Sequence, residues 1–358
     1  MLKQALSSRQ RVRLALAHQE TDRIPIAMVC AGINPPAYRD LEQYLGQTRG
    51  ISVAEYLDPL IDIVGVGPDY TGPALARNED IWGVKREPIS YGTGSYDEIA
   101  VYPLAGADNP GDLDRHAWPT TAMFDYSVLP DQIAAVRAKG ERCTMVANGN
   151  IFETSWYMRG FERMLADFAV NPELAWAIME GVTDFYVEHF SKVLSAAKGG
   201  ADLVFTADDI GSQRGLLMSL PMWERMVKPH HARLNATIHE FGAKVIYHSD
   251  GAVMDAVEGL IDMGIDILQA LQFSADGMDP ARLKSAYGDR LCFEGGVSVQ
   301  TTLPFGTPEQ VRCEVEELIT VLGREGGYIL GPSHAIQAGT PAENIVAMFD
   351  TAASFYPY

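Results

Sequence analysis

Short apolar runs alternate with longer amphipathic stretches along most of the chain. Eight of these runs have the length and β-branched content of buried strands: 24–29, 61–66, 144–147, 203–206, 245–247, 267–271, 291–293 and 328–330. Strands that alternate with helices predict a parallel sheet covered by helices, an α/β fold. Eight is the number of strands in a closed (β/α)8 barrel, so the pattern predicts a TIM barrel.

The stretches between these runs carry helix signals. In 253–263, apolar residues repeat on one face before Gly264 stops the helix. The segment 307–322 opens with a Thr-Pro-Glu-Gln sequence, in which Thr307 can cap the helix and Gln310 takes the capping-box position. Both segments are therefore predicted to be helices between strands.

The interval 69–140 breaks this rhythm, because it is rich in Pro, Gly, Tyr and Trp. We interpret it as an insertion over the barrel mouth, within a single domain that spans residues 1–358. No internal repeat is visible, which argues against a solenoid.

The charge of the chain excludes some classes of partner. Its 47 acidic and 28 basic residues give a formal net charge of −19, and no block of Lys or Arg compensates locally. Such a surface repels phosphate backbones and anionic lipids, so we expect neither nucleic acid nor membrane as a partner.

The first twenty residues alternate charged and apolar positions, unlike a signal peptide. The four cysteines are scattered without a CxxC pair, which suits a reducing compartment. We therefore expect a cytoplasmic protein without disulfides. The oligomeric state stays open, and a homodimer is one assembly to consider.

Polar residues follow almost every predicted strand. In a barrel the carboxyl ends of the strands form the active-site face, so these residues predict a catalytic or binding mouth, although each one taken alone could also be a helix cap. In strand order they are Asn34, Asp69, Asn148 with Glu153, Asp208 with Asp209, His248 with Asp250, Gln269 with Gln272, Glu294, and Ser333 with His334.

The segment His248-Ser249-Asp250-Gly251 is the most informative of these ends. An imidazole and a carboxylate two residues apart can both face one site. Three interpretations remain open: metal ligation by His248 and Asp250, a carboxylate-oriented histidine in acid/base catalysis, or capping of the next helix by Asp250.

His334 follows the eighth strand, and a closed barrel can aim the fifth and eighth strands at the same axis. Two histidines and a carboxylate, His248, His334 and Asp250, would suit zinc with an open coordination position. In the loop after the fourth strand, only one of the neighbours Asp208 and Asp209 is expected to face the pocket, since adjacent side chains on a strand point to opposite sides.

Together these segments resemble the uroporphyrinogen decarboxylase superfamily, which includes corrinoid-dependent zinc methyltransferases. The resemblance spans nearly the whole chain. It is carried by the motifs at 9–18 and 21–25, Asp208-Asp-Ile-Gly-Ser-Gln-Arg-Gly215, His248-Ser-Asp-Gly251, the segments 295–300 and 303–309, and Tyr328-Ile-Leu-Gly-Pro-Ser-His334.

The resemblance to the methyltransferases implies a zinc ion bound by a His-x-Cys pair after the fifth strand and a Cys after the eighth. Here His248 matches the histidine, while Asp250 and, approximately, His334 stand at the cysteine positions. This implies transfer of a methyl group from a methoxylated or methylated small substrate. Gln272 and Glu153 are candidates for a fourth ligand.

The remaining site residues receive supporting roles in this hypothesis. Asp208, Glu153 and Asp69 are the candidate catalytic residues, and Asp208 and Glu153 are expected to orient the substrate or shuttle a proton. Asn148, Arg214 and Gln272 are expected to bind the substrate.

The methyl acceptor is expected to be a corrinoid held by a separate protein. A built-in corrinoid domain is normally marked by Asp-x-His-x-x-Gly, and the nearest match, which begins with Asp114 and His116, ends in Pro119.

True uroporphyrinogen decarboxylase is the alternative function. Decarboxylases of the family carry an arginine-rich loop after the first strand and a substrate-binding Asp after the second. Asp69 could correspond to that Asp, but the segment 30–36 contains no arginine. A substrate bearing many carboxylates would be held poorly by so acidic a protein.

Overall fold

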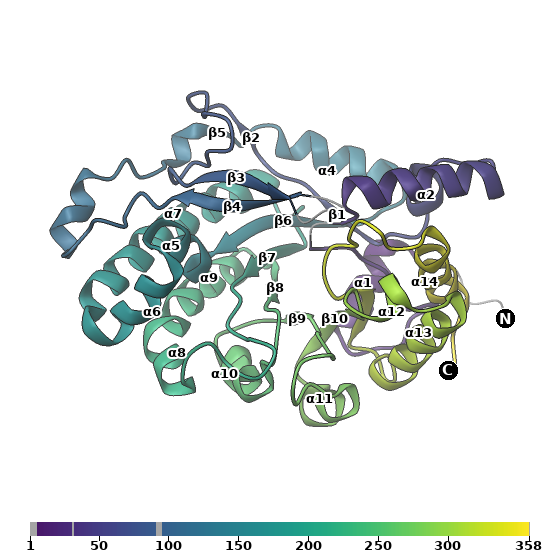
Figure 1. Cartoon of the computed structure of the whole chain (residues 1–358). Helices are drawn as coiled ribbons and strands as arrows, with labels where there is room; N and C mark the ends of the chain where they lie inside the picture. The colour runs from purple at the N-terminus through teal and green to yellow at the C-terminus, as the bar shows by residue number, and fades with distance from the viewer. Residues whose placement is uncertain (1–5, 31, 91–94, 358) are drawn as a thin grey trace.

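The computed structural model describes residues 6–30, 32–90 and 95–357. Its centre is a curled, fully parallel sheet of seven strands in the order β1-β6-β7-β8-β9-β10-β11, surrounded by helices (Figure 1). The predicted parallel α/β architecture is confirmed, and seven of the eight predicted runs form its strands. These are β1 (Ile63–Gly65), β6 (Cys143–Asn150), β7 (Leu203–Ala207), β8 (Lys244–His248), β9 (Ile267–Ala270), β10 (Cys292–Val297) and β11 (Tyr328–Pro332).

The remaining predicted run, 24–29, is extended but makes only an isolated parallel bridge, between Ile26 and Leu330. The Leu330 amide donates to the carbonyl of Pro25 at 2.8 Å, and the Asp62 amide donates to that of Ile26 at 2.8 Å. The run therefore contacts both β11 and the residue before β1, the two edges of the sheet. Pro25 has no N–H to donate, which shortens the ladder that this run can form.

The helices lie in the intervals between strands. They are α1 (Ser8–Leu16), α2 (Pro35–Thr48), α3 (Val53–Leu57), α4 (Leu129–Ala138), α5 (Ile151–Arg159), α6 (Phe161–Val170), α7 (Pro172–Ala197), α8 (Leu220–Met226), α9 (Lys228–Glu240), α10 (Val257–Asp262), α11 (Pro280–Tyr287), α12 (Thr302–Phe305), α13 (Pro308–Leu322) and α14 (Ala342–Ser354). Short 3₁₀ turns are η1 (Pro110–Arg115), η2 (Thr121–Met123) and η3 (Met254–Ala256).

Both helices predicted from local signals are present. The helix α13 starts with the predicted capping box, in which the Thr307 side chain accepts from the Gln310 amide and the Gln310 side chain accepts from the Thr307 amide. The segment 253–263 is helical as well, but it is divided into η3 and α10. None of the described helices combines the length and apolar composition needed to cross a bilayer.

The interior of the curled sheet is filled by side chains. Val12 and Ala15 of α1 belong to the same buried cluster as inward-facing residues of the strands, such as Ile246 and Ile329. The helix α1 thus covers the end of the sheet opposite the strand carboxyl ends. Arg11 strengthens this cover through an ion pair of 2.7 Å with the fully buried Asp62, so the motif near the N-terminus has a structural role.

The interval 69–140 forms small antiparallel pairs outside the main sheet. Strand β2 (Asp69–Tyr70) pairs with β5 (Phe124–Asp125), and β3 (Lys85–Ser90) pairs with β4 (Ser95–Val101) as a hairpin. Residues of this hairpin line the same cavity as the strand ends. The interval also contains η1, η2 and α4.

Candidate active site

His248 is the last residue of β8, and its side chain is almost completely buried. It points into the curled sheet like Ile246, two residues earlier, because side chains on a strand alternate between its faces. Its register partner on β9 is Gln269, whose Oε1 forms a short hydrogen bond with His248 Nδ1. The Gln269 Nε2 donates to the carbonyl of Ser333 at 3.5 Å.

This hydrogen bond sets the tautomer of His248. Since the amide oxygen of Gln269 can only accept, Nδ1 must carry the proton, and Nε2 is left with a free lone pair. That Nε2 atom lies 3.5 Å from Asp209 Oδ1. A histidine fixed in this way by a neighbour is prepared to act as a ligand or as a base.

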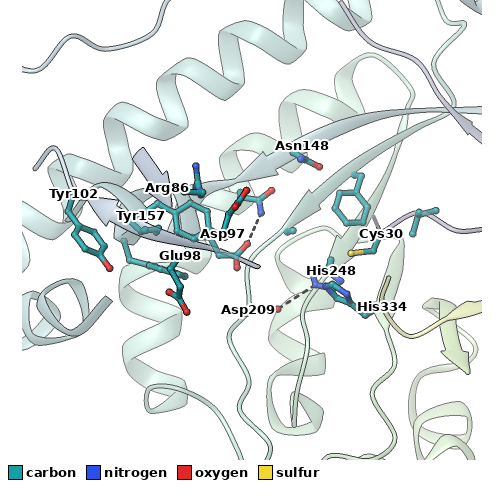
Figure 2. A pocket seen from close by; sticks show the side chains of 17 residues that line it. Cys30, Arg86, Asp97, Glu98, Tyr102, Asn148, Tyr157, Asp209, His248 and His334 are labelled. Atoms are coloured by element: carbon teal, nitrogen blue, oxygen red, sulfur yellow. Dashed lines mark hydrogen bonds and ion pairs between the residues drawn. The ribbon is translucent and has the colours of Figure 1, made fainter. Parts of the chain in front are cut away.

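Two groups of potential metal ligands share His248. Cys30, His248 and His334 place their ligand atoms within 4.8 Å of one another, and so do Asp209, His248 and Asp250. The rings of His248 and His334 have their centroids 5.7 Å apart. Figure 2 shows Cys30, His248, His334 and Asp209 together at one end of the cavity. The structure therefore brings together His248 and His334, but it divides the predicted ligands His334 and Asp250 between two groups.

Cys30 was not predicted as a site residue. It follows the extended run 24–29, so it carries the same signal as the other strand-end residues. Asn34, the residue named at this strand end from the sequence, does not line the cavity. Burial raises the pKa of the Cys30 thiol to about 12, and the carboxylates of Asp250, Glu294 and Asp209 add to this effect.

Asp250 does not cap the helix that follows it. Neither η3 nor α10 has a side-chain cap at its start. Burial raises the pKa of the Asp250 carboxyl; His248 and His334 oppose this rise, and Asp209 reinforces it. Its backbone amide donates to Asp209 Oδ1 at 2.7 Å. The side chain therefore remains available to the site.

Gly251 completes this turn with a φ of 88°. An added Cβ would lie 2.6 Å from the backbone of Gly211, so the two loops could not approach as they do.

Asp208 and Asp209 point to different sides of the loop after β7. The Asp208 carboxylate is fully buried; it accepts the amides of Phe152 and Glu153 at 2.7 Å each and forms a short hydrogen bond with His231. It thus holds the first turn of α5, and it does not line the cavity. Asp209 lines the cavity instead.

Glu153 lies in the first turn of α5 and lines the cavity. Burial raises the pKa of its carboxyl to about 8, and the negative charges of Asp209 and Asp208 add to the rise. The Asn150 side chain donates to Glu153 Oε2 at 2.6 Å. At neutral pH Glu153 is therefore mostly a neutral acid that can give a proton to a bound group.

The cavity has a volume of about 600 Å³ and two chemically different ends. Opposite the histidines, the hairpin and α5 contribute acidic and aromatic side chains (Figure 2). Among the lining residues that the structure describes, the one Lys or Arg side chain is that of Arg86, which is paired with Asp80 at 2.8 Å. The lining residues are Val29, Cys30, Arg86, Asp97, Glu98, Ile99, Tyr102, Asn148, Asn150, Glu153, Trp156, Tyr157, Phe205, Ala207, Asp209, His248 and His334.

Asn148 is in this set, whereas five of the nine predicted site residues are not: Asp208 and Asp250, described above, and Asp69, Arg214 and Gln272. Asp69 is exposed in β2 and pairs with Asp125, and Arg214 is exposed in the loop after β7. Gln272 is buried beside the cavity, where it accepts the Gly251 amide at 2.8 Å and so supports the turn after His248.

The comparison with known families agrees with these motifs. The family described as "Uroporphyrinogen decarboxylase (URO-D)" matches residues 117–355, well over half of the chain. The chain belongs to the uroporphyrinogen decarboxylase family. The resemblance recognised from the sequence is thereby confirmed.

Individual relatives of the family fall into two groups. A methylated-thiol–coenzyme M methyltransferase of Methanosarcina mazei is 30% identical over 196 residues, 55% of this chain and 49% of that protein, so the match spans about half of this relative. A uroporphyrinogen decarboxylase of Anaeromyxobacter dehalogenans is 23% identical over 362 residues, 95% of this chain and 97% of that protein.

A solved structure shares the fold over almost the whole length. It is a methyltransferase from Methanosarcina mazei, with a TM-score of 0.68 over 98% of this chain and 99% of the other, at 19% identity. At this identity the likeness supports the fold alone.

Proposed function

We propose that this protein is a zinc-dependent methyltransferase, which takes a methyl group from a methoxylated or methylated small substrate and passes it to a corrinoid on a separate protein. The observation that carries the proposal is the convergence of two groups of potential metal ligands on His248. The similarity to a methyltransferase that acts on methylated thiols favours this reaction within the family.

The residues present fit a zinc ion. Zinc in catalytic sites takes three nitrogen, sulfur or oxygen ligands and keeps one position open. The proposal retains His248, His334 and Asp250 as candidate ligands; His248 belongs to both groups of potential ligands, His334 to one, and Asp250 with Asp209 to the other. When bound, the ion would act as a Lewis acid on the heteroatom that carries the methyl group.

The other residues would position the substrate and supply a proton. Glu153, neutral at pH 7, would protonate the heteroatom as the methyl group leaves. Asn148 would contact the substrate, and Trp156, which also lines the cavity, would help to exclude water from it. Asp208 would act indirectly, through the first turn of α5 that carries Glu153.

Three further elements belong to the proposal. The run around Ile26 would close the sheet into an eight-stranded barrel, as its contacts with both sheet edges suggest. The chain would be one domain, with the interval 69–140 over its mouth. The corrinoid protein would dock over that mouth, where the cavity opens.

Uroporphyrinogen decarboxylation is less well supported. Its substrate carries many carboxylates, which arginine side chains bind best. Here the cavity offers Arg86, already paired with Asp80, and it is lined by the acids Asp97, Glu98 and Asp209. The full-length match to a decarboxylase shows shared ancestry, but the lining opposes a polyanionic ligand.

The test combines metal analysis with a transfer assay. Purified wild type should contain stoichiometric zinc and should transfer methyl groups from a methyl thioether to cob(I)alamin, followed by absorbance. His248→Ala should lose both the zinc and the transfer. Wild type without stoichiometric metal would overturn the proposal, and conversion of uroporphyrinogen to coproporphyrinogen would favour the decarboxylase instead.

A further inference from the structure

We propose that Cys30 is a ligand of the same metal ion, so that the ion is held by one thiolate and two imidazoles from Cys30, His248 and His334. This inference rests on the proposed metal-dependent function and changes its ligand set. In this ligand set Cys30, which comes from a different part of the chain, takes the place of Asp250.

The three ligand atoms already lie near the positions that zinc requires. They are within 4.8 Å of one another. Zn–S and Zn–N bonds of about 2.3 and 2.0–2.1 Å in a tetrahedral site place ligand atoms about 3.3–3.6 Å apart. Ion binding would therefore draw these atoms closer together, through rotation of the Cys30 and His334 side chains toward His248.

The backbone holds Cys30 and His334 in fixed relative positions. Two residues beyond His334, Ile336 forms a parallel bridge with Ile33. The Asn34 amide donates to the Ile336 carbonyl at 2.8 Å, and the Ile336 amide donates to the Gly32 carbonyl at 3.0 Å. The two loops are thus tied together directly beside the ligands, and such preorganisation favours ion binding.

His248 is held independently by Gln269. Its Nδ1 is occupied by the Gln269 side chain, so Nε2 is the nitrogen that can bind the ion. The ligands therefore come from three separate segments, each with its own support.

The ligand chemistry favours this group over the acidic one. Thiolate and imidazole are ligands that select zinc, whereas carboxylates suit magnesium, calcium and manganese. In the group of Asp209, His248 and Asp250, Asp209 Oδ1 already accepts the Asp250 amide at 2.7 Å. The carboxylates of Asp209 and Asp250 would then lie near the ion without binding it, and their negative charge would offset its positive charge.

Cys30 is distinct from the other cysteines of the chain. Cys143 and Cys292 are buried in the interior of the sheet, and Cys313 is exposed on α13.

Metal binding by Cys30 would release its thiol proton to solvent, as ligation by a thiol requires. Three protein ligands would leave a fourth position for the substrate heteroatom, and the thiolate would favour sulfur at that position.

Cobalt substitution tests this ligand directly, without an activity assay. Chelator-treated full-length protein is loaded with Co²⁺, and its near-ultraviolet absorption is recorded. A thiolate ligand gives a charge-transfer band that imidazole and carboxylate ligands do not give. Wild type and the matched control Cys313→Ser should show the band, and Cys30→Ser should lose it. The zinc affinity of Cys30→Ser should fall by more than the roughly 10- to 100-fold typical of outer-shell changes.

The outcomes separate this inference from the proposed function. Wild type that binds one cobalt ion without the band would overturn the ligand assignment alone. Wild type that binds no ion would overturn both. If Cys30→Ser does not fold, alkylation of wild type decides instead: bound zinc should protect Cys30 from iodoacetamide, as mapped by mass spectrometry, and labelling of Cys30 at an unchanged rate would overturn the inference.

Discussion

Asp208 and Asp209 are neighbours in the chain, yet Asp208 accepts the amides of Phe152 and Glu153 in the protein interior, while Asp209 lies 3.5 Å from His248 in the cavity. One carboxylate holds a helix and the other belongs to the site. Their substitutions should therefore affect different properties of the protein.

We expect Asp208→Ala to destabilise the fold by about 3–5 kcal/mol, because it leaves two helix amides and the buried His231 without their acceptor. Urea unfolding measures this loss. Asp209→Ala is the matched control, and it should cost less, about 1–2 kcal/mol, since Asp209 is part-exposed and accepts one backbone amide, that of Asp250. Equal losses for both variants would contradict the division of roles.

Gln269 should control metal affinity through His248. Gln269→Leu removes the acceptor for His248 Nδ1, so the ring can rotate or change tautomer. The affinity for zinc should fall about 10- to 100-fold, as for other outer-shell partners. Competition with a chromophoric chelator measures it. Gln47→Leu, at an exposed position of α2, serves as the control. An unchanged affinity in Gln269→Leu would contradict the role of Gln269 in positioning His248.

The sequence could predict the frame of the fold because each strand carries its own local signal. Seven runs became strands, and the capping box at Thr307 formed as its residues indicate. The run 24–29 formed no regular strand, because Pro25 lacks a donor and the pairing depends on Leu330 and Asp62, far away in the sequence. A local hydrophobic pattern does not show which distant residues a strand will pair with.

The site was harder to predict, because its geometry depends on side-chain direction. Alternation along a strand indicated that one of Asp208 and Asp209 would face the pocket, but which one depends on the position of α5. Gln272 and Arg214 are polar residues near strand ends, like His334, and only the fold shows that they do not line the cavity. Cys30 carries only the signal of its position after the run 24–29, since a lone cysteine has no spacing motif, and that signal does not show that it lies beside His248 and His334.

Glu153 should make the stability of the protein depend on pH. The pKa of its carboxyl in the folded state is about 8, raised from 4.5 mainly by burial and then by Asp209 and Asp208. Because the folded state holds this proton more tightly than the unfolded state, the stabilising effect is complete below about pH 4.5 and is lost as the pH rises through 8. The contribution of Glu153 to the free energy of unfolding should therefore decrease as the pH rises from about 4.5 to about 8.

Glu153→Gln removes the titration while it keeps a neutral side chain of the same size. The decline of Tm between pH 5 and pH 9 should be smaller in this variant than in wild type, as measured by calorimetry. Glu87→Gln, on the exposed face of the hairpin, is the control and should leave the decline unchanged. Parallel Tm curves for wild type and Glu153→Gln would show that Glu153 does not retain its proton at neutral pH.

The charge of the cavity should select the charge of the substrate. In the hairpin, Arg86 pairs with Ile99 and Pro88 with Asp97, so Arg86, Ile99 and Asp97 share a face, and all three line the cavity. Arg86 is already paired with Asp80. The carboxylates of Asp97 and of its neighbour Glu98, which also lines the cavity, are thus left to attract a cationic group at the end of the cavity opposite the histidines.

A pair of methyl thioethers of similar size tests this selection. We expect 2-(methylthio)ethylamine to bind at least about tenfold more tightly than 3-(methylthio)propanoate, a difference of about 1.4 kcal/mol, with the gap narrowing as salt is added. Calorimetric titration of the zinc-loaded protein measures both affinities. Asp97→Asn should reduce the preference, whereas Glu87→Gln, at a position of the hairpin that does not line the cavity, should retain it. Tighter binding of the propanoate would mean that Arg86 leaves Asp80 to receive an anion, and the substrate would then be a carboxylate.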